Sequence, residues 1–194
     1  MPIRRATALV AFVLVLATVA LAAPAGAATV SPGSWAPKFC TALSTWKDAL
    51  TTGADNTESA LSGGITNLSQ AKSEVVAFLG RSVKQTDTAV SSLKKAGVPS
   101  TTNGKKIAST FVNGLQSASD LFASAKKKAQ NIPTSSAAKF KASAQNVTTA
   151  LNNGSKKVSD SFSDVSKLDK KGELSSALQA EPSCAFLSGD SSGS

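Results

Sequence analysis

The sequence has no histidine and no tyrosine, and it contains a single methionine. Histidine is the commonest general acid or base at neutral pH and the commonest metal ligand, so its absence removes the usual basis of both kinds of site. A nucleophilic serine also needs a neighbouring base, and histidine cannot supply it here. No glycine-rich loop ends in Lys-Ser or Lys-Thr, so the pattern of a phosphate-binding loop is absent as well. We therefore expect a protein that is not an enzyme and that uses no cofactor and no metal.

Arginine and aromatic residues are scarce as well. Arg81 is the only arginine after residue 5, and aromatic residues make up 5% of the chain. Nucleic-acid binding depends on bidentate arginine contacts to phosphates and bases and on aromatic rings that stack on bases. Nucleic acid is therefore an unlikely partner.

The first 27 residues have the features of a cleavable signal peptide. Arg4 and Arg5 form a basic start, residues 6–23 are uncharged and mostly apolar, and Ala25-Gly26-Ala27 supplies the small residues that signal peptidase requires. We expect cleavage after Ala27, with Ala22 or Ala28 as alternative sites. An uncleaved membrane anchor is the competing interpretation, but Pro24 and Gly26 would break its helix.

Processing would leave a chain with 19 basic and 12 acidic side chains and a formal charge of +7, since Arg4 and Arg5 lie in the leader. Its length suits one domain. We expect residues 28–187 to form that domain and residues 188–194, which are rich in Ser and Gly, to be a disordered tail. No second apolar segment is long enough to span a membrane.

Two cysteines follow the leader, Cys40 and Cys184. An even number of cysteines in an exported chain usually means a disulfide. We expect a Cys40–Cys184 bond, which would close almost the whole domain into one loop. A redox pair or a shared metal site is less probable, because there is no C-x-x-C motif and no histidine.

Apolar residues recur every three or four positions, which is typical of helices and not of strands. The first run of apolar residues at this spacing, or apolar stripe, predicts a short helix over about 37–52, followed by a turn at residues 53–56. A second stripe starts at Leu61 and predicts a helix that is firm from about Ile65 and ends at Gly97-Val98-Pro99.

The third stripe predicts a helix from Ile107 to Ile132. The fourth starts after residues 134–136 and keeps its phase across Asn152-Asn153-Gly154, so we favour one long helix to about Leu168 over a hairpin. A short helix at 173–180 follows. The fold class is thus all-α: an up-down antiparallel helical bundle with three long helices, a short N-terminal helix and a short C-terminal helix.

Lysine clusters are the clearest electrostatic feature of the chain. The candidate contacts for a polyanion are Lys94, Lys95, Lys105, Lys106, Lys126, Lys127, Lys128, Lys170 and Lys171. Most of them lie near expected helix ends, where a cation also favours the helix dipole, so a purely structural role is the simpler interpretation. Binding to an anionic wall polymer or lipid headgroups is the functional one.

Two further groups of residues have both a plain and a functional interpretation. Trp35, Phe39 and Trp46 would seal one end of the bundle around the disulfide, or Trp35 would be exposed and mark a contact surface. Asp160, Asp164, Asp169 and Glu173 recur at near four-residue spacing and suggest a metal or catalytic site, but the lysines between them favour ion pairs on a solvated face.

Four short segments resemble one known group of proteins: Trp35 with Phe39-Cys40, Leu-Lys-Lys-Ala-Gly-Val-Pro at 93–99, Gly-Lys-Lys-Ile-Ala at 104–108, and Glu-Pro-Ser-Cys at 181–184. Together they make the chain similar to the small secreted helical proteins of high-GC Gram-positive, actinobacteria-like species, a group without an assigned function. The resemblance implies an envelope or extracellular setting and no activity.

We therefore expect a secreted, non-catalytic helical bundle, extracellular or associated with the cell wall. Its expected partner is a cell-wall polymer, an anionic lipid surface or an envelope protein. The alternative is a carrier that holds an apolar small molecule or lipid between its helices.

Overall fold

The computed structural model describes residues 28–62 and 67–188. Within them lie six helices: α1 (Pro32–Ser62), α2 (Leu68–Ala96), α3 (Gly104–Gln130), α4 (Ala137–Leu168), α5 (Glu173–Ala180) and the 3-10 helix η1 (Pro182–Ser188). The expected signal peptide with its cleavage site at Ala27, and the tail from residue 189, lie outside the described residues. So does Ile65, the expected start of the second helix.

The first helix is twice as long as predicted. It starts at Pro32, where the Ser31 hydroxyl accepts a hydrogen bond from the Ser34 N–H at 3.2 Å. Pro37 lies inside the helix, and the Gly33 carbonyl that loses its partner there is on an exposed residue. The predicted turn at 53–56 is wrong, because the helix continues to Ser62 and includes Leu61.

Close packing of α1 against α2 at Gly53 explains why the first helix continues beyond residue 52. A Cβ at Gly53 would lie 3.3 Å from the Phe78 ring, so the glycine lets α1 and α2 approach closely. One turn later the Thr57 hydroxyl donates to the Gly53 carbonyl at 2.8 Å, and Thr57 is buried. Packing against α2 therefore outweighs the low helix propensity of this segment.

Helices α2 and α3 follow the predictions closely. Asn67 caps α2 by accepting a hydrogen bond from the Gln70 N–H at 2.9 Å. The helix ends at Gly97, whose φ of +88° suits glycine. α4 is a single continuous helix across residues 152–154, as its unbroken apolar phase predicted, and α5 has the predicted bounds.

A feature without a sequence signal closes one end of the bundle. Thr29–Val30 (β1) pairs in parallel with Val98–Pro99 (β2). The Val98 N–H donates to the Ala28 carbonyl at 2.9 Å, and the Ser100 N–H donates to the Val30 carbonyl at 2.7 Å. The first described residues are thereby attached to the α2–α3 connection.

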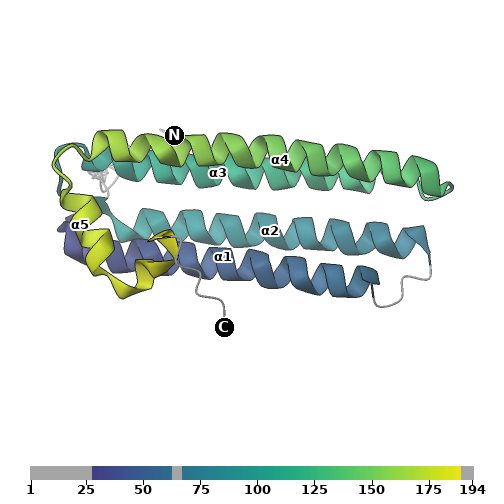
Figure 1. Cartoon of the computed structure of the whole chain (residues 1–194), viewed down its shortest axis with the longest axis horizontal. Helices are drawn as coiled ribbons and strands as arrows, with labels where there is room; N and C mark the ends of the chain where they lie inside the picture. Colours follow the sequence, from purple (N-terminus) through teal and green to yellow (C-terminus); the bar gives the residue numbers. More distant parts are fainter. Residues whose placement is uncertain (1–27, 63–66, 189–194) are drawn as a thin grey trace, which may run out of the picture.

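The long helices run alternately up and down the bundle (Figure 1). The main contacts join α1 to α2, α2 to α3 and α3 to α4, while α5 and η1 pack on α1 at one end. The chain thus forms the predicted all-α antiparallel bundle, but with four long helices, so the expectation of a short N-terminal helix is wrong. No helix in the described ranges is long and apolar enough to cross a membrane.

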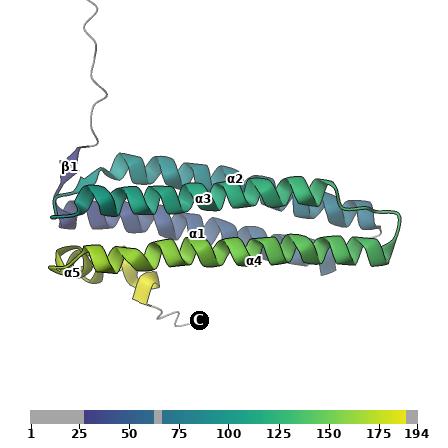
Figure 2. The same ribbon diagram turned by 90° about the horizontal axis from the view of Figure 1, so that it is seen from above.

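Two separate clusters of buried residues form the core. One lies at the end with α5, which we call the disulfide end, and draws on α1, α2, α3, α4, α5 and η1. The other lies towards the opposite end, which we call the loop end, and is built from α2, α3 and α4. Figure 2 shows α5 and β1 gathered at the disulfide end.

Candidate binding surfaces

The predicted disulfide is present. Cys40 of α1 and Cys184 of η1 are bonded, with their Cα atoms 5.0 Å apart. Both cysteines are buried, so the bond is part of the core and offers no exposed redox site. It holds the C-terminal segment against the first helix.

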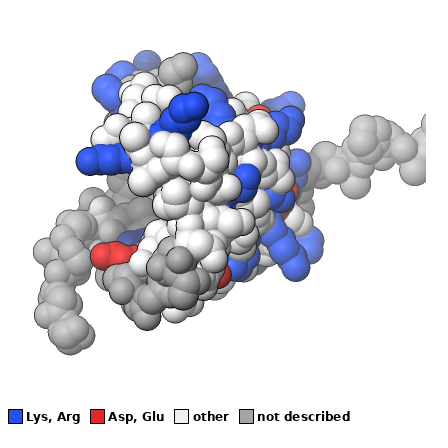
Figure 3. All heavy atoms as spheres, turned by 90° about the vertical axis from the view of Figure 1, so that its right-hand side faces the viewer, with Lys and Arg blue, Asp and Glu red and all other residues white. Residues whose placement is uncertain are grey.

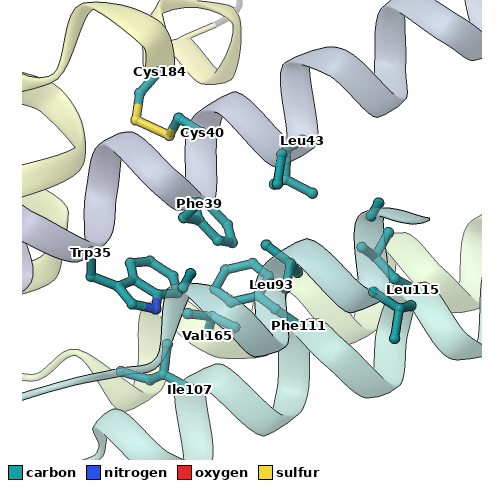
Figure 4. Packing of buried hydrophobic residues seen from close by; sticks show 14 of the residues in the cluster. Trp35, Phe39, Cys40, Leu43, Leu93, Ile107, Phe111, Leu115, Val165 and Cys184 are labelled. Atoms are coloured by element: carbon teal, nitrogen blue, oxygen red, sulfur yellow. A yellow bond between two sulfur atoms is a disulfide. The ribbon is translucent and has the colours of Figure 1, made fainter. Parts of the chain in front are cut away.

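Trp35 is buried, which confirms the interpretation that it seals one end of the bundle, so the alternative of an exposed contact is wrong. Its side chain is 1% exposed, and its indole N–H donates to the Gly97 carbonyl at 3.1 Å. Its ring stacks on Phe39 with centroids 4.3 Å apart, and Phe39 meets Phe111 at 4.5 Å (Figure 4). Because α1 starts five residues earlier than expected, Trp35 lies on the same helix face as Phe39 and seals the disulfide end.

The predicted polyanion contacts are divided between the two ends of the bundle. Six of these lysines lie near the disulfide end, in the last turn of α2, the first turn of α3 and the connection from α4 to α5; they are Lys94, Lys95, Lys105, Lys106, Lys170 and Lys171. All six are exposed, and in the described part of the chain none forms an ion pair with a carboxylate. Their side chains therefore lie in contact with solvent.

The other three lie at the loop end, and they differ from one another. Lys127 and Lys128 are exposed, whereas Lys126 is half-buried and lies against α2, where a Cβ at Gly80 would be 3.4 Å from its Nζ. Figure 3 shows this end, with Lys and Arg side chains scattered over its upper and right-hand parts among uncharged residues. Lys126 therefore has a packing role that its two neighbours lack.

A further lysine at this end, Lys72, was not predicted to have a role. Its ammonium group donates to the carbonyls of Gln130 at 3.1 Å and Ile132 at 3.3 Å, at the end of α3. Here a cation satisfies carbonyl groups that a helix terminus leaves without partners. The lysines thus include both structural and freely exposed members.

The carboxylates suggested as a metal or catalytic site do not form one in the described residues. Asp169 caps α5: its carboxylate accepts the Ser175 N–H at 2.7 Å and the Leu174 N–H at 3.3 Å. Glu173 is exposed in the first turn of α5. The side chains of Asp160 and Asp164 lie outside the described residues, and no group of three potential metal ligands occurs among the described ones.

A groove that was not predicted lies between α1 and α2. Its volume is about 600 Å³. It is lined by residues of both helices: Pro37, Lys38, Thr41, Ala42, Thr45 and Trp46 from α1, and Gln85, Thr88, Ala89, Ser92, Lys95 and Ala96 from α2. We call this the α1–α2 groove. The groove exists because the side chains of Ala42, Ala89, Ser92 and Ala96 are small. In the sequence, small residues at this helical spacing predict only that two helices pack closely.

The groove brings Lys95, a predicted polyanion contact, near Lys38, which was not singled out. The other predicted lysines do not line it. No protein-family model matches the chain, and neither the search of curated proteins nor that of solved structures found a match. Function is therefore inferred from the geometry and charge of the chain itself.

Proposed function

We propose that the protein is a secreted, non-catalytic helical bundle that binds an anionic polymer at or outside the cell surface. The observation that carries this proposal is the set of exposed lysines at both ends of the bundle. Eight of the nine predicted contact lysines are exposed, and in the described ranges those eight have no carboxylate partner.

The chemistry of the positive charge fits a long anionic partner better than one compact anion. Lysine is a flexible point charge, whereas compact phosphate sites favour the planar fork of arginine, which is nearly absent here. Lysines spread over both ends give a diffuse attraction that acts on any repeated negative charge. Such binding weakens as salt increases, because exposed charges are screened beyond about 8 Å at physiological ionic strength.

Two features support export. The N-terminal 27 residues have the pattern of a signal peptide, and disulfides persist mainly in oxidising compartments outside the cytosol. A protein that leaves the cytosol with a net positive charge meets the anionic polymers of the envelope directly. This setting makes them the natural candidates for the partner.

The test is cosedimentation of the processed protein with isolated cell walls over a range of salt concentrations. We expect binding at low salt that falls by about tenfold or more as salt is raised to about 0.5 M, because screening weakens each exposed charge. No binding at low salt, or an unchanged bound fraction at high salt, would contradict the proposal.

Two matched variants test whether both ends contribute. K105Q/K106Q/K170Q/K171Q removes four exposed charges at the disulfide end, and K127Q/K128Q/K139Q/K141Q removes four exposed charges at the loop end. A diffuse attraction predicts a similar loss of wall binding in both. Wild-type binding by both variants would refute a role for the lysines.

A further inference from the structure

The α1–α2 groove has the dimensions of a site for a short segment of a linear molecule. Its lining runs from Pro37 to Trp46 along α1, so with a rise of 1.5 Å per residue it is about 13 Å long. Residues 85–96 of α2 line the other side. A ligand lying in it would follow the helix axes and contact both helices.

The Trp46 ring lines one end of the groove, and a hydrogen bond fixes its position. The Trp46 indole N–H donates to the Thr86 hydroxyl at 2.9 Å, and that hydroxyl donates to the Ser82 carbonyl at 2.7 Å. Thr86 is fully buried, whereas Trp46 is half-buried and lines the groove. Because the ring is already fixed, a ligand packing on it has little side-chain entropy to remove.

The opposite end of the groove is positively charged. Lys38 and Lys95 line it there and are exposed, while no acidic residue lines any part of it. An anionic group at this end would therefore meet two cations and no opposing charge. The charge favours a ligand that carries an acid on one part of its length.

Between these ends, polar side chains lie along a lining that is otherwise mostly apolar. Hydroxyl groups of Thr41, Thr45 and Ser92 and the amide of Gln85 line the groove, whereas the Thr88 hydroxyl already donates to the Lys84 carbonyl at 2.9 Å. A purely apolar cargo would bury the groups of Thr41, Thr45, Ser92 and Gln85 without hydrogen bonds, which is unfavourable. A ligand rich in hydroxyl groups would satisfy them.

We propose that the α1–α2 groove binds an acidic polyol, meaning a sugar or polyol segment that carries a phosphate or carboxylate group. Lys38 and Lys95 pair with the acid, the lining hydroxyls hydrogen-bond to the polyol, and Trp46 packs on its apolar C–H face. This inference rests on the proposed function and deepens it, since it locates one segment of the anionic polymer in a defined site.

The experiment is a titration of the processed protein with soluble oligomers, monitored by tryptophan fluorescence. The acidic probes are an oligogalacturonate and a glycerol-phosphate oligomer, which separate the carboxylate source from the phosphate source, and a neutral malto-oligosaccharide is the control. The chain has two tryptophans, and Trp35 is buried at the disulfide end, so we expect saturable emission changes from Trp46. W46F should abolish the signal.

A matched pair of variants distinguishes the groove from diffuse attraction. K38Q/K95Q and K127Q/K128Q each remove two exposed charges, but only the first pair lines the groove. Because charge-assisted hydrogen bonds are roughly twice as strong as neutral ones, we expect K38Q/K95Q to weaken binding of the acidic oligomer by about tenfold or more, and K127Q/K128Q by about twofold or less. Circular dichroism checks that each variant remains folded.

The possible results separate the two proposals. Equal weakening by both variants, or binding of the acidic oligomer that calorimetry detects without a Trp46 signal, would overturn the groove while leaving diffuse polymer binding intact. Equal affinity for the neutral oligosaccharide would show that the ligand needs no acidic group. Laurate serves as an apolar anionic probe, and tighter binding of laurate than of the acidic oligomers would overturn the polyol in favour of an apolar cargo. Absence of both oligomer binding and wall cosedimentation would overturn the proposed function as well.

Discussion

The two ends of the bundle are built differently. At the disulfide end, all four long helices, α5 and η1 contribute to one cluster that contains Trp35, Phe39 and Phe111, and a covalent bond crosses it. At the loop end, the cluster draws on α2, α3 and α4, and its fully buried members include Ala125 and Ala129. The same four-helix architecture therefore has one densely connected end and one sparsely connected end.

The N-terminal and C-terminal parts of helix α1 differ in how many residues they bury. Its N-terminal part buries Trp35, Phe39 and Leu43, whereas residues 54–56 and 58–61 are exposed. Buried apolar area largely determines the local free energy of unfolding, so the C-terminal part of α1 should open more easily. Stability in this protein is thus concentrated where the chain ends and the α2–α3 connection meet.

Removing the disulfide should have the largest effect on this asymmetry. The bond joins residues 144 positions apart, and the chain-entropy model assigns a loop of this size about 4–5 kcal/mol. We expect C40S/C184S to lower the free energy of unfolding by about that amount, measured by urea denaturation. An unchanged midpoint would show that the cluster alone stabilises this end, and reduction of the wild type provides the control.

A matched pair of core substitutions compares the two ends directly. Phe39 is buried against two aromatic rings at the disulfide end, and Phe140 is half-buried in the loop-end cluster. We expect F39A to destabilise the protein by about 3–5 kcal/mol and F140A by about half as much, because less area becomes a cavity. Equal losses in urea denaturation would contradict the asymmetry.

Alanine substitutions at two glycines should have the smallest effects on stability. Gly97 has a φ of +88°, and a Cβ there would clash with the Ala28 carbonyl oxygen. Gly172 has a φ of +68° with no neighbouring atom within 4 Å of such a Cβ. We expect G97A to cost about 2–3 kcal/mol and G172A about 1 kcal/mol, since only the first displaces β1.

Hydrogen exchange at the Val98 amide tests whether G97A acts by displacing Ala28, since this amide donates to the Ala28 carbonyl. Faster exchange is expected in G97A but not in G172A. Equal exchange in both variants would mean that backbone strain alone accounts for the loss.

The long apolar stripes allowed most of the fold to be predicted from the sequence. The unbroken phase from Leu151 to Val165 correctly indicated one helix across Asn152-Asn153-Gly154, and the two cysteines correctly indicated their bond. The C-terminal half of α1 was missed because its contact positions hold Gly53 and Thr57, which do not continue an apolar stripe. Contacts with α2 that are distant in sequence keep it helical.

The candidate site was less accessible to sequence analysis. Lysine clusters are visible as composition, but the α1–α2 groove depends on which alanines face each other across two helices. The same limit applies to Trp35: its burial follows from a helix start at Pro32 and an acceptor on Gly97, 62 residues away. Neither relation has a local signal.

The Cys40–Cys184 bond also determines what a proteolytic cut does to the molecule. Together with the intervening backbone it forms a single covalent ring that contains most of the residues of all four long helices. One proteolytic cut anywhere in that ring opens it without dividing the molecule. Two cuts within the ring are needed before any part of it can leave, so a molecule nicked once there would keep its parts together for reassembly.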